Sequence, residues 1–202
     1  MNFQQIIATR TSLELGRTGG IPVVAEQRWG AMLMADVVGS TRLMSLDEAG
    51  TYSLYKSLRR ELIDPTIAAH RVRFVKSTGD GILAEFGSAL DAVRCAVHIQ
   101  QDMVRRSDAE LGAHRMVFRI GLSCGRIIAD DEDIYGYEVN MAARLQTLAP
   151  PGGIAMSSRV AGLIHRRLQL QLDDLGVQKL RNMGRAVHVY QCRSVGLAQT
   201  TC

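Results

Sequence analysis

The chain has 202 residues, of which 47% are hydrophobic and 22% charged, and its 24 basic and 20 acidic side chains give a net charge of +4. This composition is typical of a globular protein and excludes collagen-like and extensively disordered chains. No apolar run approaches the roughly 18 residues that cross a bilayer, and the N-terminus lacks a secretory signal, so we expect a cytoplasmic protein without membrane insertion.

An arm and an apolar strand open the chain. The first 30 residues show no sustained hydrophobic period, so we interpret residues 1–30 as an N-terminal arm. Residues 31–38 are almost wholly apolar, which favours a strand buried on both faces, and this run holds one acid, Asp36. The small residues that follow predict a turn at Gly39, Ser40 and Thr41.

A helical segment and a hairpin come next. Leucines at four-residue spacing predict a helix from Asp47 to about His70, and Pro65 is expected to kink or restart it. Residues 72–76 and 82–86 are short β-like runs, and the Gly- and Asp-rich segment between them predicts a tight turn. This turn carries a second acid, Asp80.

The middle of the chain is predicted to hold a helix and a second hairpin. Ser88 is positioned to cap a helix that reaches about Arg106, and residues 107–114 are expected to form a loop. Apolar residues alternate over 116–122, which predicts a strand. We expect Cys124-Gly125 to turn this strand and residues 127–129 to run back beside it.

The last third is predicted to begin with an acidic loop over 130–133 and a helix over 139–148, which Pro-Pro-Gly-Gly ends. Helices set between antiparallel pairs indicate an α+β fold. We therefore expect one domain over residues 31–193 and a C-terminal tail over 194–202. The remaining predicted elements are a strand over 154–157, a helix over 158–167 and β segments over 168–172 and 186–190.

The cysteines and the charged residues exclude several classes of site. Cys95, Cys124, Cys192 and Cys202 form no CxxC pair, so neither a zinc site nor a disulfide framework is indicated. The basic residues are dispersed and only 5% of the chain is aromatic, which disfavours a nucleic-acid partner. A small acidic ligand suits the same charge balance.

Asp36 and Asp80 are the first candidates for chemistry. A carboxylate at the end of an apolar strand is costly to bury unless it is paired or coordinates a cation, and glycines beside Asp80 let the backbone approach a ligand closely. Two such carboxylates suit Mg²⁺, which takes one or two protein carboxylates together with substrate phosphates. Each acid alone is equally compatible with an ordinary turn or cap.

Two further features suit a phosphorylated ligand. The backbone N–H groups of the turn at 39–41 can cradle phosphates, although neither GxxxxGK[ST] nor GxGxxG is present. Asn140 and Arg144 are four residues apart on an expected helix, so they share a face where an amide can hold a ribose and a cation can offset phosphoryl charge. An ordinary strand-to-helix turn and a solvated helix face are the alternatives.

In this order the features resemble the class III nucleotidyl cyclase catalytic domain, especially its soluble bacterial members. The resemblance covers about residues 31–192 and implies a ferredoxin-like βαββαβ core with additional helices and C-terminal β segments. The strings that carry it are ADVVGST (35–41), VKSTGDGILAEF (75–86), FRIGLSCG (118–125), DIYGYEVNMAARL (133–145), PGGIAMSS (151–158) and LRNMGRAVHVY (180–190).

The resemblance implies a metal site and a base-recognition site. Asp36 and Asp80 match the two metal-binding aspartates of the family, and Val37 would add a backbone carbonyl. The cofactors implied are two divalent ions, Mg²⁺ or Mn²⁺. Lys76 and Asp133 match the pair that recognises adenine, which favours ATP over GTP.

The resemblance also implies groups for the ribose and the phosphates. Asn140 and Arg144 match the residues that position the ribose and stabilise the transition state. Arg181 stands where the family commonly has a phosphate-binding lysine, and Arg185 is a second candidate for that role. The chain departs from the common family wording at Tyr137-Glu138, beside the expected nucleotide pocket.

The activity implied is cyclisation of ATP to 3′,5′-cyclic AMP and pyrophosphate in a head-to-tail homodimer. Each copy would supply its metal aspartates to one site and its base- and ribose-binding groups to the other. A guanylate cyclase is the first alternative, disfavoured by Lys76 and Asp133. A catalytically silent nucleotide-binding or dimerisation module is the second, disfavoured because every matched position is filled. An RNA-binding domain would need aromatic residues gathered beside basic ones.

Overall fold

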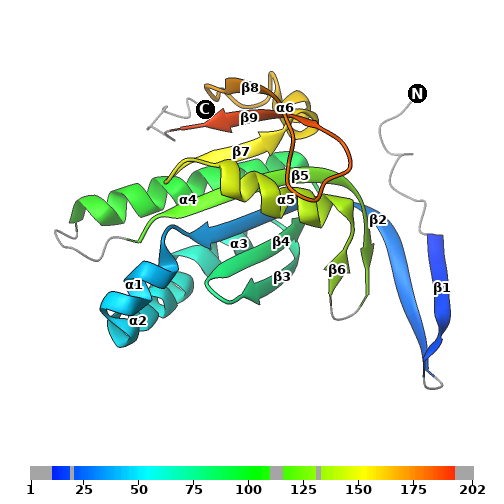
Figure 1. The fold of residues 1–202 in the computed structure, drawn as a ribbon, viewed down its shortest axis with the longest axis horizontal. Coiled ribbons are helices and arrows are strands. Elements are labelled where there is room, and N and C mark those ends of the chain that lie inside the picture. Colours follow the sequence, from blue (N-terminus) through cyan, green and yellow to red (C-terminus); the bar gives the residue numbers. More distant parts are fainter. Residues whose placement is uncertain (1–10, 19–20, 110–115, 131–132, 194–202) are drawn as a thin grey trace.

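One nine-stranded sheet forms the framework of the protein (Figure 1). The computed structural model describes residues 11–18, 21–109, 116–130 and 133–193. The strands lie in the order β3-β4-β2-β5-β7-β9-β8, with β1 paired to β2 and β6 paired to β5. Neighbouring strands are antiparallel except β5 and β7, which are parallel.

Groups of strands and groups of helices follow one another along the chain. The expected loops over 107–114 and 130–133 fall partly outside the described residues, and the tail over 194–202 falls wholly outside them. The elements are β1 (Thr11–Thr18), β2 (Ile21–Val37), α1 (Ser40–Leu46), α2 (Glu48–Leu58), the π-helical turn η1 (Arg59–Ile63), α3 (Asp64–Ala69), β3 (Val72–Thr78), β4 (Gly81–Phe86), α4 (Ala89–Ala109), β5 (Phe118–Ala129), β6 (Ile134–Tyr135), α5 (Tyr137–Leu148), β7 (Ile154–Ser157), α6 (Ser158–Ile164), β8 (Asp173–Gln178) and β9 (Val187–Cys192).

The expected α+β class and ferredoxin-like core are confirmed. Strands β3, β4, β2 and β5 lie side by side and antiparallel, with α1 to α3 connecting β2 to β3 and α4 connecting β4 to β5. In this arrangement Asp36, near the end of β2, pairs with Gly81 at the start of β4. The two candidate metal-binding acids, Asp36 and Asp80, therefore lie at the same end of the core.

Helices cover both faces of this sheet (Figure 1). The largest apolar cluster joins the sheet to α4, α3 and α6, and it includes Leu33 and Ala35 of β2. Met32 and Met34 of the same strand point the other way, into the cluster that includes Ala142 of α5. Because side chains alternate along a strand, Asp36 lies on the face that α5 covers.

Strand β2 begins at Ile21, earlier than the expected start at Ala31. Strand β1 pairs with it from Thr18↔Ile21 to Thr11↔Gln27, so much of the expected arm is a β ribbon that projects from the body (Figure 1). A regular hydrophobic period appears in a sequence when one face of a strand is buried against a core. The β1–β2 ribbon extends beyond the core and is joined by backbone pairing, so its sequence shows no such period. Strand β2 thus crosses the boundary expected between residues 30 and 31.

The turn expected at Cys124-Gly125 is wrong, because β5 runs unbroken from Phe118 to Ala129. It pairs with β2 without a register shift from Val37↔Phe118 to Glu26↔Ala129. Gly125 instead admits a neighbour: a Cβ at this position would lie 2.6 Å from Oε1 of Glu138 on α5. A glycine inside a strand here marks the close approach of another element rather than a change of direction.

The C-terminal third departs from expectation at two boundaries. Helix α6 ends at Ile164 rather than at residue 167, and the strand expected over 168–172 lies at β8 instead. The leucines of that segment alternate because they pack against the main apolar cluster, not because they join the sheet; they are Leu168, Leu170 and Leu172. Strand β9 covers most of the second expected segment, 186–190.

The long helical segment is interrupted near Pro65, as expected. Helix α2 ends at Leu58, a π-helical turn follows, and α3 starts with Pro65 in its first turn. Proline has no N–H to donate into the preceding turn, so the regular ladder cannot continue through it. The helix α1 before this segment was not expected, and a break at Asp47, which caps α2, separates the two.

A buried ion pair ties the start of β2 to β4. Nε and Nη2 of Arg28 donate to the two carboxylate oxygens of Glu85 at 3.0 and 2.6 Å, and the Glu85 side chain is 0% exposed. Gly30 lies beside the pair in close packing, because a Cβ at this position would lie 2.8 Å from Cε of Met32 and 3.2 Å from Cγ of Glu85. Arg73 lies 3.8 Å from the same carboxylate.

We expect Arg28→Met to lower the free energy of unfolding by about 3 kcal/mol, because it leaves a buried carboxylate without its two hydrogen-bond donors. Urea unfolding at fixed protein concentration measures this loss. Arg105→Met is the matched control, since its bond to Asp102 is exposed and such pairs contribute less than about 1 kcal/mol. Equal, small losses in both variants would contradict the prediction.

Two other properties bear on the sequence expectations. Within the described residues, no helix is long and apolar enough to span a bilayer. Cys95 and Cys124 are buried free thiols, and burial raises the pKa of both to about 12. Because the thiolate is the reactive form, these two side chains are inert near neutral pH.

Candidate active site

The carboxyl groups of Asp36 and Asp80 lie close together where β2 ends and β4 begins. Asp80 lies in the β3–β4 turn between Gly79, at a φ of 77°, and Gly81. A Cβ at Gly81 would lie 2.9 Å from the carbonyl oxygen of Ala35, so glycine lets the turn approach β2. Burial, and then the charge of Asp80, raise the pKa of Asp36.

This pair fits a divalent cation. Two carboxylates held together repel each other when both are ionised, and a cation between them removes that repulsion. Across the parts of the chain that the structure describes, no group of three or more His, Cys, Asp or Glu side chains could hold a metal ion. Two carboxylates suffice for Mg²⁺ when substrate phosphates complete its shell.

Arg119 is a candidate residue that the sequence analysis missed. It lies on β5 directly opposite Asp36 on β2, and its positive charge opposes the upward shift in the pKa of Asp36. Its Nε atom is buried and has no hydrogen-bond partner among the described residues. In the sequence, Arg119 could have been noticed as the one charged residue among the apolar and small residues of FRIGLSCG. Its proximity to Asp36 follows only from the pairing of β2 with β5.

Lys76 and Asp133, far apart in the sequence, are brought into contact. Nζ of Lys76, on β3, donates to Oδ2 of Asp133, just before β6. The hydrogen bond raises the pKa of Lys76 and lowers that of Asp133. The backbone N–H of Ile134 donates to the other Asp133 oxygen at 2.9 Å. This ion pair combines a donor and an acceptor, which is the hydrogen-bonding pattern that an adenine edge complements.

Helix α5 presents Asn140, which is exposed, and Arg144, which is half-buried. The helix lies very close to β5, because a Cβ at Gly121 would come within 2.1 Å of the Ala142 carbonyl oxygen. Oγ of Ser123 donates to the Glu138 carbonyl at 2.6 Å, which anchors the first turn of the helix. The small residues Gly121 and Ser123 of β5 therefore determine the distance between α5 and the sheet.

Glu138, where the sequence departs from the common family wording, packs against β5. Its side chain lies over Gly125, and burial raises its pKa. The neighbouring Tyr137 side chain is 45% exposed. Of the two unusual residues, Glu138 belongs to the packing of α5 and Tyr137 faces outward.

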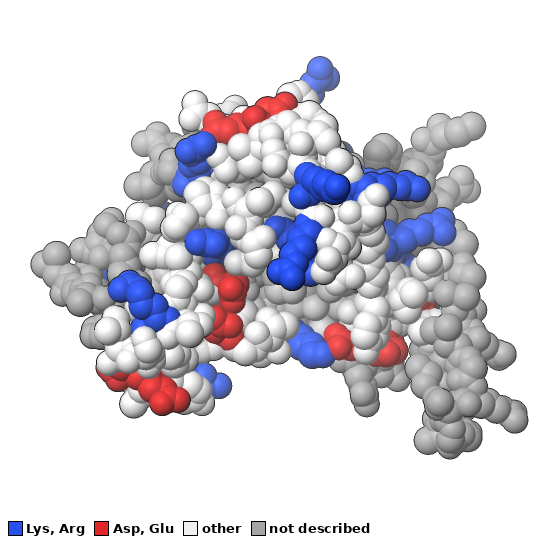
Figure 2. All heavy atoms as spheres, viewed as in Figure 1, with Lys and Arg blue, Asp and Glu red and all other residues white. Residues whose placement is uncertain are grey.

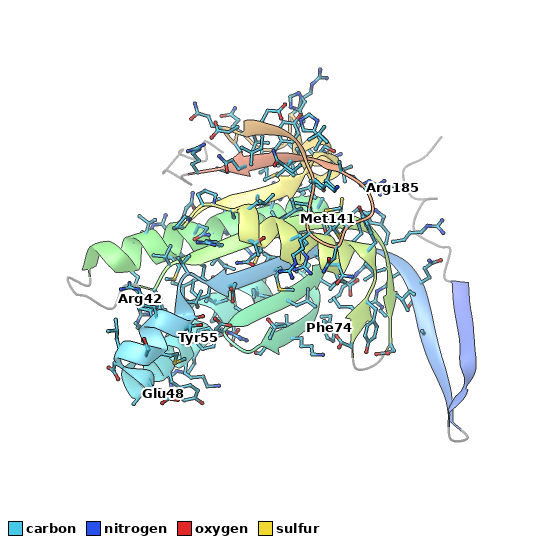
Figure 3. The ribbon with its side chains drawn as sticks, viewed as in Figure 1. Arg42, Glu48, Tyr55, Phe74, Met141 and Arg185 are labelled. Atoms are coloured by element: carbon cyan, nitrogen blue, oxygen red, sulfur yellow. The ribbon has the colours of Figure 1, made fainter. Side chains whose placement is uncertain are left out.

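The residues predicted to contact phosphates lie in two places. Gly39, at a φ of 65°, precedes α1, and the expected turn stops there, because Ser40 and Thr41 are already the first residues of this helix. Arg181 and Arg185 are exposed in the connection between β8 and β9. Figure 2 shows basic side chains gathered over α5 and this connection, and acidic side chains below them, where β2 ends and β4 begins. Figure 3 labels Arg185 on the β8–β9 connection and Met141 on α5.

The structure thus joins the predicted residues into two pairs, Asp36 with Asp80 and Lys76 with Asp133. It does not join the remaining ones to either pair. Among the described residues, no hydrogen bond or ion pair links either pair to the last group, which is Asn140, Arg144 and Arg181. The side chains of that group are available to an external ligand.

Comparison with known proteins connects this geometry to a family. Residues 25–193 match the family described as the adenylate and guanylate cyclase catalytic domain. A putative adenylate cyclase 3 of Rhizobium meliloti is 39% identical over 164 residues, which are 81% of this chain and 28% of that protein. An uncharacterised protein of Mycobacterium bovis is matched over 54% of its length, so the chain spans between about a quarter and about half of these relatives.

Solved structures show the same fold. The crystal structure of an adenylate/guanylate cyclase/hydrolase from Silicibacter pomeroyi is 43% identical, with a TM-score of 0.78, and the match covers 83% of this chain and 98% of that one. The guanylyl cyclase Cya2 is 20% identical, with a TM-score of 0.72 over 86% of this chain and 96% of that one. The second match concerns the fold alone.

Proposed function

Because the chain belongs to the adenylate and guanylate cyclase catalytic domain family, we propose that it is an adenylate cyclase, which converts ATP to 3′,5′-cyclic AMP and pyrophosphate. The observation that carries this proposal is the close pair of carboxyl groups, Asp36 and Asp80, with Arg119 opposite Asp36 on the next strand. A site of this kind suits a triphosphate and its cations. The choice of ATP is supported by the contact between Lys76 and Asp133.

The proposed reaction is intramolecular. The ribose 3′-hydroxyl attacks the α-phosphorus, a new P–O bond closes the ring, and the bond to pyrophosphate breaks. Asn140 would hold the ribose, and the Arg144 guanidinium would stabilise the negative charge that builds on the phosphoryl oxygens. Arg119 and Arg181 would bind the leaving phosphates, with Gly39 and the first residues of α1, Ser40 and Thr41, donating N–H groups. Phosphoryl transfer depends on positioning and electrostatics, so no side-chain nucleophile is required.

Divalent cations belong to this proposal. Asp36, Asp80 and the Val37 carbonyl would hold two Mg²⁺ or Mn²⁺ ions. Bound ions of this kind activate the attacking hydroxyl and neutralise phosphate charge. The chain's own contribution is the placement of the two carboxylates, which the β2–β4 pairing and the glycines beside Asp80 secure.

A head-to-tail homodimer completes the proposed site. One protomer would provide Asp36 and Asp80, and its partner would provide Lys76, Asn140 and Arg144. Two observations support this: Asn140 is exposed, and within the described part of the chain no hydrogen bond or ion pair joins Asn140 or Arg144 to the metal aspartates. Symmetric dimers with two equivalent interface sites are the commonest assemblies.

The test of the proposed function is a turnover assay with Mn²⁺ and either ATP or GTP. We expect cyclic AMP to form at least about tenfold faster than cyclic GMP, because a site built to hydrogen-bond one base loses those bonds with a base of a different donor and acceptor pattern. Lys76→Met should lower kcat/KM for ATP and reduce this preference, whereas Lys56→Met, on exposed α2, should change neither. Faster cyclic GMP formation would favour a guanylate cyclase, and no product from either nucleotide would favour a silent module.

A further inference from the structure

The β3–β4 hairpin that carries Lys76 and Asp80 is braced by the junction of α2 and the π-helical turn. Nη1 of Arg59, the first residue of that turn, donates to Oγ of Ser77 at 2.8 Å. The same nitrogen donates to Oη of Tyr55 at 3.3 Å, and this hydroxyl in turn donates to the Gly81 carbonyl at 3.5 Å. Figure 3 shows the Tyr55 side chain of α2 beside the end of this hairpin.

These bonds reach both sides of the metal-binding turn. Ser77 precedes Asp80 by three residues on β3, and Gly81 follows it directly on β4. The strands pair at Ser77↔Ile82 and Thr78↔Gly81, so the two contacts lie at the last rungs before the turn. The Arg59 guanidinium can therefore fix the backbone on both sides of Asp80, and with it the position of the Asp80 carboxylate.

The π-helical turn positions the Arg59 side chain to bond to the hairpin. The N–H of Asp64 bonds to the Arg59 carbonyl five residues earlier, and Nε of Arg59 donates to Oδ1 of Asp64 at 2.7 Å. The extra residue in the turn brings two side chains five apart onto one side, where the carboxylate holds the guanidinium plane. The Arg59 side chain is 14% exposed, whereas that of the next residue, Arg60, is 79% exposed.

We propose that Arg59 is a positioning residue of the active site, which holds the Lys76–Asp80 hairpin through Ser77 and Tyr55. It touches neither substrate nor cation in this role. The inference rests on the proposed cyclase function, because it assigns Asp80 a metal to bind. Groups that orient a metal ligand are worth about 10- to 100-fold in metal affinity or activity when they are removed.

The test compares Arg59→Met, Arg59→Lys and Ser77→Ala with the matched control Arg60→Met. Turnover of ATP is measured against Mn²⁺ concentration, and hydrogen–deuterium exchange is measured across residues 77–82 without metal or nucleotide. We expect Arg59→Met to lower turnover by about 10- to 100-fold, to raise the Mn²⁺ concentration for half-maximal activity and to speed exchange in the hairpin. Arg59→Lys keeps the charge but not the fork of donors, so it should recover part of each effect.

Ser77→Ala should move all three measurements in the same direction by less, because it removes one acceptor and leaves Tyr55 in place. Arg60→Met should match the unchanged protein, since the exposed Arg60 side chain bonds to the neighbouring Glu61 and not to the hairpin. If Arg59→Met does not fold, Ser77→Ala decides the question alone. Unchanged metal dependence and unchanged exchange in folded Arg59→Met or Ser77→Ala would overturn the proposal.

The experiment separates this inference from the proposed function. If the unchanged protein forms no cyclic nucleotide, the proposed function fails, and the exchange measurement still shows whether Arg59 braces the hairpin. If the unchanged protein is active and Arg59→Met behaves like Arg60→Met, the inference alone fails.

Discussion

Mixing Asp36→Ala and Arg144→Ala proteins should restore about a quarter of the activity of the unchanged protein, although each variant alone is expected to lose about 100- to 1,000-fold. In a head-to-tail dimer the two residues belong to different halves of each site. Random exchange makes half of the dimers mixed, and each mixed dimer has one site with both residues intact. The product is cyclic AMP, measured after the two purified proteins have exchanged subunits.

The matched control for this experiment mixes Asp36→Ala with Asp80→Ala. Both residues are assigned to the same half-site, so each site of a mixed dimer keeps one defect and activity should not return. Exchange of subunits is verified independently with two affinity tags. A site built within one protomer predicts no recovery in either mixture, and that result would sink the shared-site proposal.

Gly121→Ala is expected to have the largest effect of any single methyl group added to the protein. Its Cβ would lie 2.1 Å from the Ala142 carbonyl oxygen and 2.2 Å from the Gln146 nitrogen, and both atoms belong to the backbone of α5. Relief requires the whole helix to rise from the sheet. We expect a loss of about 3 kcal/mol in the free energy of unfolding, at the upper end for overpacking.

The same substitution should lower turnover by about 100-fold or more, because α5 carries Asn140 and Arg144 and a shift of about 1 Å is costly in an active site. Urea unfolding and ATP turnover measure the two effects. Gly162→Ala is the control: beyond the neighbouring backbone of its own helix no atom lies within 4 Å of its Cβ, and alanine within α6 should stabilise the protein by about 0.5–1 kcal/mol. Equal behaviour of the two variants would show that α5 is not held against Gly121.

Local patterns identified the elements whose signals lie within a few residues. The spacing of apolar residues predicted α5, and the Gly and Asp content of the β3–β4 turn predicted a hairpin with Asp80 at its tip. Ser88 was expected to cap α4, and its Oγ accepts from the N–H of Leu90 at 3.1 Å. Capping and turn formation depend on neighbours in the chain, so composition at a few positions was sufficient.

Glycines in strands were harder to interpret. A glycine within a strand is compatible with a turn of the chain and with the close approach of a helix side chain. At Gly125 we expected the turn, whereas the Glu138 side chain lies over an unbroken strand. The extension of β2 to Ile21 was also missed, because its partner β1 supplies backbone hydrogen bonds rather than a buried apolar face. Both errors concern contacts between segments and not the preferences of single residues.

The sequence by itself determined the fold class and the residue types of the candidate site: the carboxylates Asp36 and Asp80, the Asn140–Arg144 face and, by family resemblance, Lys76 and Asp133. Only the tertiary structure decided which of these meet. It placed Asp36 against Asp80 and Arg119, and it set Arg59 behind the hairpin. The physical reason is that strand register and helix packing bring together side chains separated by tens of residues, and no local spacing encodes that distance.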